Sequence, residues 1–368
     1  MSNLSDISVV LPSLDPDEKL TAVIDGLLEY GFTDIILIND GSKPENLHYF
    51  EEADRHPEVH LLHHEVNRGK GAALKTAFTW FLVNRPDAKG VVTVDGDNQH
   101  HPADTKACSE HMMETGRLVL GVRDFDQPDV PFKSRNGNKI TSFVFKVFVG
   151  MIISDTQTGL RAIPRKDLQI LNTVSGDRFE YETNMLLAMK THSIPFDEVK
   201  IRTVYIEENK SSHFRAFRDS WRIYKLILAH FFKYTLSSLA SAVVDEGLFV
   251  LLTHLLRNAL SGFALTAIPM AVARVISSLM NFYVNKKLVF DAHVSTGKAM
   301  AKYFALAVPQ AIAQLALTYG AYELFRISES ATFLRGLIYA IVMTILFFAS
   351  FVIQQRWVFT EKKEKQSV

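Results

Sequence analysis

Residues 90–104 read Gly-Val-Val-Thr-Val-Asp-Gly-Asp-Asn-Gln-His-His-Pro-Ala-Asp. The apolar run at 91–94 predicts a buried β-strand that ends directly on two carboxylates, Asp95 and Asp97, with Gly96 between them. Side chains alternate along a strand, so both carboxylates project to the same side. They repel each other unless a cation or a donor lies between them. Carboxylate oxygens are suitable ligands for Mg²⁺ or Mn²⁺ that is carried on a diphosphate. The alternative interpretation of this stretch is a polar turn that caps the following helix.

The chain before this stretch predicts a strand, a helix and a second strand. Residues 7–12 are a short apolar run, residues 18–30 have a helical pattern, and residues 34–40 are a second apolar run that ends on Asp40. This succession favours a parallel sheet, which binds ligands at the carboxyl ends of its strands. Asp40 is therefore expected at the ligand edge, although capping a turn is the alternative role.

A glycine-rich basic turn, residues 67–78, follows and leads into a helix. Its glycine spacing is neither that of a P-loop nor that of a dinucleotide-binding loop. Arg68 and Lys70 stand beside free backbone N–H groups at a helix N-terminus, where phosphate oxygens bind. A purely structural tight turn is the alternative.

Four motifs, taken in order, resemble family 2 glycosyltransferases of the GT-A fold. They are Pro12 after the first strand, Asn-Asp-Gly-Ser at 39–42, Asn-Arg-Gly-Lys-Gly at 67–71 and Asp-Gly-Asp-Asn-Gln-His at 95–100. Within that family the motifs are most similar to the polyprenyl-phosphate (dolichyl-phosphate) sugar synthases, and the resemblance covers essentially the whole first half of the chain. It implies an α/β GT-A (Rossmann-like) catalytic domain.

The same resemblance implies roles for the acidic strand ends. Asp40 would hold the nucleobase or ribose of a nucleotide sugar, and Asp95 and Asp97 would manage a metal-bound diphosphate. Gln99 falls where this branch keeps a glutamine near its metal. Residues 13–15 read Ser-Leu-Asp, where the family commonly has an aromatic residue and an asparagine, so a UDP-sugar and a GDP-sugar both remain open as the donor.

Polar residues after position 104 are further candidates for binding the substrates. Arg123 closes an apolar run and Arg135 opens a helix, and guanidinium groups bind phosphate in a bidentate way, although solvated surface arginines are the alternative. The small and polar residues of 155–162 favour an acceptor-side loop over a core element. In the family an acid comes from the helix start near 180, which we assign to Glu182 rather than Glu180, with simple capping as the alternative.

Residues 207–215 are polar, charged and serine-rich, a composition that suits a loop folding over a diphosphate, with a linker to the membrane as the alternative. The predicted catalytic residues are Asp97, Glu182 and Arg135, and the predicted metal ligands are Asp95, Asp97 and Gln99. The predicted substrate-binding residues are Pro12, Asp40, Arg68, Lys70, Asp95, Gln99, Arg123, Lys210, Ser211 and Arg215.

Composition narrows the class of protein. The 368 residues include 40 Lys and Arg and 40 Asp and Glu, so overall charge gives no reason to expect nucleic-acid binding. The one cysteine, Cys108, excludes a disulfide framework and fits a reducing compartment. The N-terminus lacks the basic and apolar regions of a secretory signal, so we expect the first domain in the cytoplasm.

After about residue 229 the chain consists of long apolar runs, near 236–256, 262–284, 303–325 and 334–354, each close to the ~20 residues that cross a bilayer. The positive-inside rule places both termini in the cytoplasm, because one side of a four-pass arrangement carries Lys233, Lys286, Lys287, Lys298, Lys302, Arg356, Lys362 and Lys363. We expect a multi-pass inner-membrane protein. Its parts are a GT-A domain (1–214), an interfacial amphipathic helix with basic and aromatic faces (215–232) and an all-α four-helix transmembrane domain (233–368).

The membrane half repeats itself with an offset of 69 residues. Lys233-Tyr recurs as Lys302-Tyr, and Asn-Phe-Tyr-Val-Asn-Lys-Lys-Leu-Val-Phe at 281–290 recurs as Ser-Phe-Val-Ile-Gln-Gln-Arg-Trp-Val-Phe at 350–359. One offset for both pairs predicts two parallel hairpin repeats. This half resembles the GtrA-like membrane family, which implies handling of a polyprenyl-linked sugar.

Three charged residues interrupt the apolar runs: Asp245 and Glu246 in the first, and Arg274 in the second. A charge at the bilayer centre costs about 2.5 to 3.5 kcal/mol, so these side chains are expected to face one another rather than lipid. A structural ion pair and a polar track for a headgroup are both open roles.

The resemblance implies an enzyme, namely an inverting, metal-dependent hexosyltransferase. It would pass a sugar from a nucleotide sugar to polyprenyl phosphate at the cytoplasmic membrane face, for cell-surface glycan or glycolipid synthesis. A lipid-linked-sugar transporter or scaffold with a ligand-binding first half is the alternative from another class. A polysaccharide synthase is a third, although no Gln-x-x-Arg-Trp motif was found in the acceptor region. A homo-oligomer stays open.

Overall fold

The computed structural model describes residues 4–127, 130, 132–202, 216–290, 292, 294–328 and 330–360. The chain divides into two compact units, Met1–Leu226 and Ile227–Val368. Helix α8 (Ala216–Leu256) continues without a break through position 232, where a domain boundary was predicted. The predicted boundaries remain proposals, and the predicted basic and aromatic faces of 215–232 fall mostly on side chains outside the described residues.

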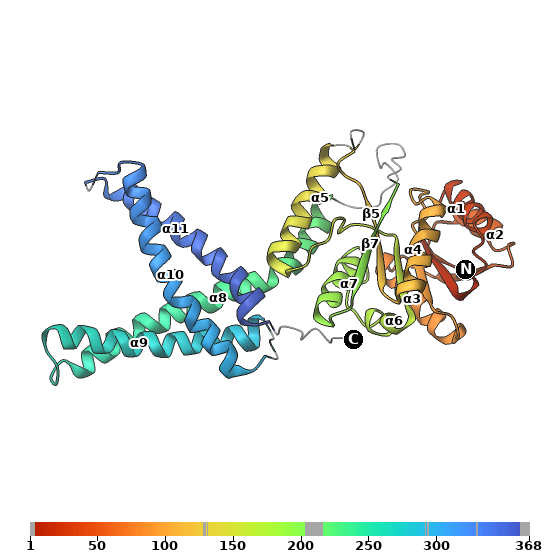
Figure 1. The fold of residues 1–368 in the computed structure, drawn as a ribbon. Coiled ribbons are helices and arrows are strands. Elements are labelled where there is room, and N and C mark those ends of the chain that lie inside the picture. Colours follow the sequence, from red (N-terminus) through yellow and green to blue (C-terminus); the bar gives the residue numbers. More distant parts are fainter. Residues whose placement is uncertain are drawn as a thin grey trace. The chain divides into compact units, whose positions relative to one another are not determined.

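Within the described part of the first unit, seven strands form one sheet in the order β3-β2-β1-β4-β6-β5-β7. Strands β5 and β7 are labelled in Figure 1, with helices beside the sheet. Neighbouring strands are parallel except where β6 pairs, which it does antiparallel with β4 and with β5. The carboxyl ends of the parallel strands therefore share one edge, as the succession of strand, helix and strand predicted. The strands are β1 (Ile7–Ser13), β2 (Ile35–Asp40), β3 (Val59–His64), β4 (Gly90–Thr93), β5 (Leu118–Arg123), β6 (Arg161–Pro164) and β7 (Phe196–Ile201).

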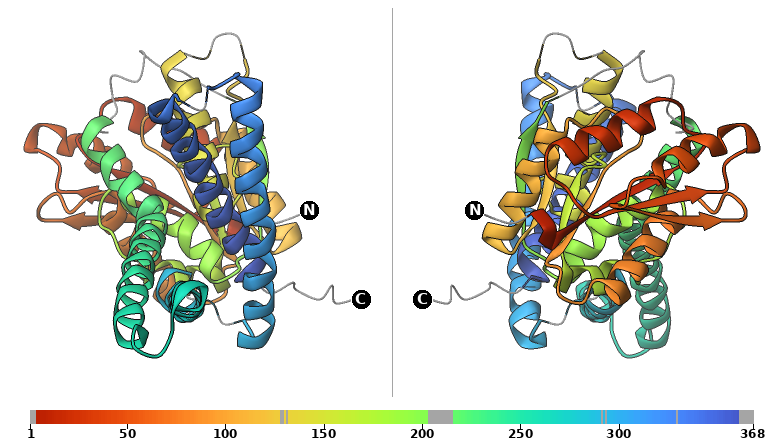
Figure 2. Two further views of the ribbon diagram at one scale, coloured as in Figure 1. Left: turned by 90° about the vertical axis from the view of Figure 1, so that its left-hand side faces the viewer. Right: turned by 90° about the vertical axis from the view of Figure 1, so that its right-hand side faces the viewer.

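Helices cover both faces of this sheet (Figure 2). On one face α1 (Lys19–Glu29) contacts α2 (Leu47–Ala53) and α4 (Pro102–Thr115), and on the other α3 (Lys70–Asn84) contacts α6 (Arg165–Leu171) and α7 (Glu180–Thr191). Helix α1 buries Leu20, Val23, Ile24 and Leu27, whose helical spacing makes one apolar stripe against the strands. The remaining elements are the short helices η1 (Leu4–Asp6) and η2 (Pro44–Asn46), α5 (Phe132–Val144) and the π-helical turn η3 (Phe145–Val149).

The segment 155–162 is a correction to the sequence-based expectation. Residues 155–160 form a loop, as expected, but Asp155, Thr158 and Arg161 are at most 2% exposed, so the segment belongs to the core, and Arg161 begins β6. Its polar groups are buried because they have partners: Asp155 pairs with Arg123, and Thr158 Oγ1 donates to the carbonyl of Gly121. Polar composition alone does not reveal such pairing.

The second unit consists of two helical hairpins. The first is α8 with α9 (Gly262–Val284), the second is α10 (Thr296–Leu324) with α11 (Thr332–Ile353), and the π-helical turns η5 (Asn285–Val289) and η6 (Gln354–Val358) end them. Four stretches among the described residues are long and apolar enough to cross a membrane: Phe231–Leu256, Gly262–Val289, Thr296–Leu324 and Thr332–Val358. The predicted architecture, an α/β domain followed by four apolar helices, is confirmed.

The internal repeat is confirmed in space. Asn285 and Gln354 stand 69 residues apart, and Asn285 Nδ2 donates to Gln354 Oε1 at 3.2 Å. Phe290 and Phe359 have the same offset, and their rings stack with centroids 5.1 Å apart. Equivalent residues that contact each other lie on the axis that relates the two copies. The hairpins are therefore related by a pseudo-two-fold axis that passes through these two pairs.

The expected intramembrane ion pair forms between Asp245 and Arg274, whereas Glu246, which was also expected to face this pair, is exposed. Arg274 Nη2 lies 3.0 Å from Asp245 Oδ2, and Ser277 Oγ donates to Asp245 Oδ1 at 2.9 Å. Arg274 and Ser277 come from α9 and Asp245 from α8, so the contact ties the two helices of the first hairpin together.

Replacing Arg274 with Met should destabilise the second unit more than replacing Arg274 with Met and Asp245 with Asn together. The single change strands a carboxylate at mid-span, which costs about 2.5 to 3.5 kcal/mol, whereas the double change removes both charges. Detergent-titrated thermal unfolding of the full chain measures the difference. A double variant whose loss equals the sum of the two single losses would show that the pair contributes nothing.

Candidate active site

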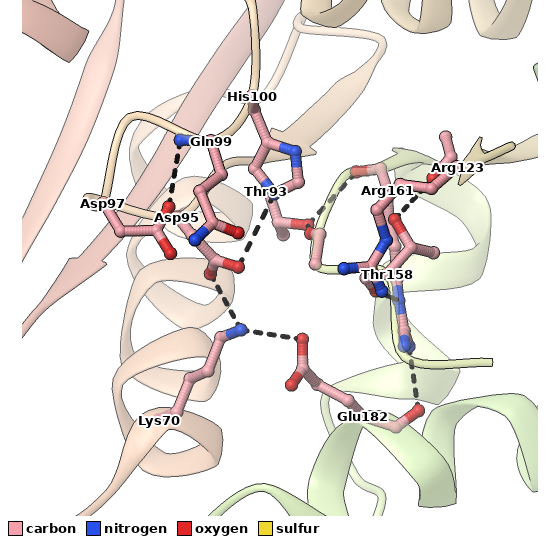
Figure 3. A network of polar contacts seen from close by, with 12 residues as sticks. Lys70, Thr93, Asp95, Asp97, Gln99, His100, Arg123, Thr158, Arg161 and Glu182 are labelled. Atoms are coloured by element: carbon pink, nitrogen blue, oxygen red, sulfur yellow. Dashed lines mark hydrogen bonds and ion pairs between the residues drawn. The ribbon is translucent and has the colours of Figure 1, made fainter. Parts of the chain in front are cut away.

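Three elements bring charged side chains together beyond the end of β4 (Figure 3). Strand β4 ends at Thr93, and Asp95 and Asp97 follow it. Lys70 is the first residue of α3, and its Nζ lies 2.8 Å from Asp95 Oδ1 and 3.0 Å from Glu182 Oε1, which projects from the first turn of α7. One ammonium group thus bridges two carboxylates at the ligand edge of the sheet. Of the two glutamates weighed from the sequence, Glu182 is the one in this bridge.

The charges of Lys70 and Asp95 stabilise each other. Burial alone would lower the pKa of Lys70, but the carboxylates of Asp95 and Glu182 outweigh it and raise that pKa above its usual value. Burial would raise the pKa of Asp95, yet Lys70, with His100 Nε2 3.5 Å from Asp95 Oδ2, holds it well below its usual range. Both groups are therefore charged throughout the physiological pH range.

Asp97 is in the opposite situation. Burial and the neighbouring charge of Asp95 raise the pKa of Asp97, and the backbone N–H of Gln99, which donates to Asp97 Oδ1 at 3.1 Å, opposes this only in part. The fold thus holds a carboxylate whose charge it does not fully compensate. A cation that contacts Asp95 and Asp97 would supply the missing charge.

The donor set fits a hard divalent cation. No group of three or more His, Cys, Asp or Glu side chains that could hold a metal occurs in the described part of the chain. Mg²⁺ is typically bound through one or two carboxylates together with substrate phosphates, so the two aspartates and the amide oxygen of Gln99 match that mode without a larger cluster.

The glycine-rich turn is fastened to β2 by Asp40. This carboxylate is 3% exposed and accepts hydrogen bonds from the backbone N–H groups of Arg68 (3.0 Å) and Gly69 (2.7 Å). His64 Nδ1 lies 2.6 Å from Asp40 Oδ1. Because Lys70 follows directly, Asp40 sets the position from which Lys70 reaches the carboxylates. The predicted role of Asp40 in nucleotide binding stays a prediction.

Replacing Asp40 with Asn should cost about 1 to 3 kcal/mol of folding free energy, because an amide has one acceptor oxygen for two buried backbone N–H groups. Chemical denaturation measures the loss. Asp177→Asn is the matched control: Asp177 pairs with Lys75 of the same helix α3 but is exposed, so at most about 1 kcal/mol is expected. If Asp40→Asn keeps its stability but loses affinity for a nucleotide sugar, Asp40 acts on the ligand directly.

The two arginines predicted to bind phosphate have partners in the protein. Arg123 Nε and Nη2 lie 2.7 and 3.2 Å from the two oxygens of Asp155, which is fully buried, and Arg135 Nη2 donates to the carbonyl of Gln127 at 2.6 Å. Pro12 lies within β1. The roles of these residues in binding stay predictions. Lys210, Ser211 and Arg215 lie outside the described residues.

Comparison with known proteins agrees with this division of the chain. Residues 8–171 match Glycosyl transferase family 2, and residues 233–359 match the GtrA/DPMS transmembrane domain. The chain joins a family 2 glycosyltransferase domain to a GtrA/DPMS transmembrane domain. The resemblance inferred from the four motifs and from the membrane repeat is confirmed.

Several curated proteins are similar to part of this chain. The UDP-N-acetylglucosamine–dolichyl-phosphate N-acetylglucosaminyltransferase of Methanococcus voltae is 26% identical over 219 residues, which are 55% of this chain and 86% of its own. The undecaprenyl-phosphate 4-deoxy-4-formamido-L-arabinose transferase of Yersinia pestis is 26% identical over 170 residues, 44% of this chain and 50% of its own. An uncharacterised Methanocaldococcus jannaschii protein is 28% identical over 235 residues, 62% of this chain and 94% of its own.

Two residues that contact the candidate site, Gly159 and Arg161, were not identified from the sequence. A Cβ on Gly159 would lie 2.3 Å from Asp95 Oδ2, so only glycine allows this approach. Arg161 is 1% exposed and donates through Nη1 to the carbonyl of Glu182 (2.8 Å) and through Nε to that of Thr158 (3.1 Å). An arginine inside the apolar run Leu-Arg-Ala-Ile was the available signal, because a charge is buried only with partners.

Proposed function

We propose that this glycosyltransferase transfers a sugar from a nucleotide diphosphate sugar, UDP- or GDP-linked, to a polyprenyl phosphate. The observation that carries the proposal is the charged cluster of Lys70, Asp95, Asp97 and Glu182 at the ligand edge of the sheet, in a chain that also has a transmembrane domain. The names of the Methanococcus voltae and Yersinia pestis relatives, which specify a dolichyl and an undecaprenyl phosphate acceptor, support the lipid.

The reaction needs positioning more than a strong base. A phosphate monoester is mostly doubly ionised near neutral pH, since its second pKa is about 6. One of its oxygens attacks the anomeric carbon of the sugar, and the bond from that carbon to the diphosphate oxygen breaks, so the nucleoside diphosphate leaves with the electron pair. A single displacement of this kind inverts the anomeric centre. The protein contributes orientation and charges that are already in place.

Lys70 and the two aspartates have distinct parts in this scheme. Lys70 is held by Asp95 and Glu182 with its charge fixed, next to where negative charge increases on the leaving diphosphate. Asp95, Asp97 and Gln99 would hold a Mg²⁺ or Mn²⁺ ion, which neutralises that diphosphate when bound. Arg123 and Arg135 are proposed as further phosphate contacts, with Arg135 and Glu182 among the catalytic residues.

The positive-inside rule supports a location in the cell membrane with both termini in the cytoplasm. Lys233, Lys286, Lys287, Lys298 and Lys302 all lie near the ends of the spans that meet at the pseudo-two-fold axis, and this end is proposed as the cytoplasmic one. A cytoplasmic first unit has access to nucleotide sugars and to the phosphate headgroup of the lipid.

Membranes that contain the full chain, incubated with radiolabelled nucleotide sugars and undecaprenyl phosphate, test the function. We expect label in a lipid that dissolves in organic solvent and loses its sugar in mild acid. Label in a polymer would instead assign a polysaccharide synthase. Absence of any labelled product with every donor offered would assign a carrier or scaffold whose first unit only binds ligand.

A further inference from the structure

Two charged side chains of the first hairpin are exposed halfway through their membrane spans. Glu246 is exposed on α8, and the Arg274 side chain on α9 is 72% exposed although it pairs with Asp245. Each lies 15 residues from the end that the two spans share (246 − 231 and 289 − 274), so they have the same depth. A charge facing lipid there costs about 2.5 to 3.5 kcal/mol. This face therefore requires a polar cover.

The second hairpin shows that the fold itself does not require these charges. The residues 69 positions later are Leu315 and Met343, which are 73% and 39% exposed. Equivalent surfaces of the same architecture thus carry apolar side chains toward the bilayer. Glu246 and Arg274 mark a property of the first hairpin alone.

The exposed face of α8 has the spacing of a helix-packing seam. Leu236, Leu239, Val243, Glu246 and Val250 follow one another at alternating steps of three and four residues. The four apolar members are 58 to 67% exposed. A period of 3.5 residues keeps one side of a helix against a partner helix in a left-handed crossing, the commonest crossing in membrane bundles. Glu246 lies inside this stripe.

We propose that a second copy of this chain covers this face, with Glu246 of each copy paired with Arg274 of the partner subunit. A copy inserted in the same direction has its guanidinium at the depth of Glu246, because both residues lie 15 positions from the same span ends. In a two-fold contact the pairing occurs twice, and each guanidinium contacts its own Asp245 and the other copy's carboxylate. The two stripes then pack against each other.

Local charge favours a protein partner over an anionic lipid headgroup. Asp245, Glu246 and Arg274 together carry a net charge of −1, and the one guanidinium already contacts a carboxylate. A phosphate group would approach an exposed carboxylate and a neutralised arginine. A second copy offers a guanidinium to each exposed carboxylate, so charge complementarity selects it.

Cysteine cross-linking of the full chain in lipid bilayers, at low protein density, tests the seam. Val243→Cys, one turn from Glu246, should cross-link between copies, whereas Ile312→Cys, the equivalent position of the second hairpin and 64% exposed, should not. The unmodified chain gives the background, because Cys108 is fully buried. Equal yields at the two positions would overturn the proposal.

A second experiment tests the charges of Glu246 and Arg274 by replacing each with the residue type found at the equivalent position of the second hairpin. In the Val243→Cys chain, Glu246→Leu should lower the cross-linked fraction at least about tenfold, and Arg274→Met should do the same, while Leu315→Ala leaves it unchanged. A folded monomer after size-exclusion chromatography shows that association, not folding, was lost. An unchanged cross-linked fraction in Glu246→Leu, or a wild-type monomer that retains polyprenyl phosphate instead of a partner, would refute the proposed contact.

Discussion

We expect an Asp97→Asn chain to lose about a hundred- to a thousandfold in the rate of sugar transfer and to unfold at the same temperature as the wild type or a higher one. Transfer should fall because Asp97 is one of the carboxylates proposed to hold the cation that neutralises the leaving diphosphate. Stability is kept because burial and the charge of Asp95 already disfavour the charged form of Asp97 in the fold, so its removal relieves repulsion. Functional sites commonly exchange stability for activity in this way.

Asp167→Asn is the matched control for this result. Asp167 is 6% exposed, and burial raises its pKa as it does that of Asp97, but it lies in α6 and takes no part in the cluster. Its replacement should leave both transfer and stability close to wild type. Label transfer and thermal unfolding are measured on the three chains side by side. If Asp97→Asn transfers at more than a tenth of the wild-type rate, or unfolds early, Asp97 does not have the proposed role.

A Lys70→Met chain should lose about 3 to 5 kcal/mol of folding free energy together with its activity. Lys70 Nζ is the group between Asp95 and Glu182, and its loss leaves two partly buried carboxylates facing each other without a cation. Adding Glu182→Gln to the same chain removes one of those charges. We therefore expect the double variant to regain stability while transfer stays lost, which a denaturation cycle measures.

Lys75→Met is the comparison for this cycle. Lys75 lies in the same helix α3 and pairs with Asp177 at 2.6 Å, but the Asp177 side chain is 68% exposed. A solvent-exposed pair contributes at most about 1 kcal/mol. Equal losses in Lys70→Met and Lys75→Met would show that the bridge at the candidate site has no special energetic weight. The same conclusion would follow if the Lys70→Met, Glu182→Gln double variant were no more stable than the sum of the two single changes predicts.

Apolar runs explain why several strands could be predicted from the sequence and others could not. Strands β1, β2, β4 and β5 are nearly continuous buried runs, which is the signature of a sheet covered on both faces. Strand β3 contains three histidines in His60-Leu-Leu-His-His64, and β6 begins on a buried arginine, so their polar letters hide their place in the sheet. Strand β6 is buried throughout because its arginine has partners, whereas β3 is the half-buried edge strand of the sheet.

The residues of the candidate site likewise fall into two groups: those that the sequence identifies and those that only the structure reveals. Asp95 and Asp97 could be identified because two acids separated by one residue at a strand end are a local pattern. Glu182 was preferred to Glu180 through the family resemblance. Its bridge to Lys70, the approach of Gly159 to Asp95 and the partners of Arg161 depend on contacts between distant segments. In the membrane half, the repeat could be recognised from the sequence because one offset relates two motifs. The exposure of the Glu246 side chain could not, because it depends on how α8 packs against the other helices.

The most direct test of the proposed function counts products of the purified full chain in lipid nanodiscs with one nucleotide sugar and polyprenyl phosphate. The account predicts one nucleoside diphosphate released for each sugar found on the lipid, with both products absent when the polyprenyl phosphate is omitted and reduced together by Asp97→Asn. Release of nucleoside diphosphate at the same rate without the lipid phosphate, with the sugar recovered in water-soluble material, would contradict it.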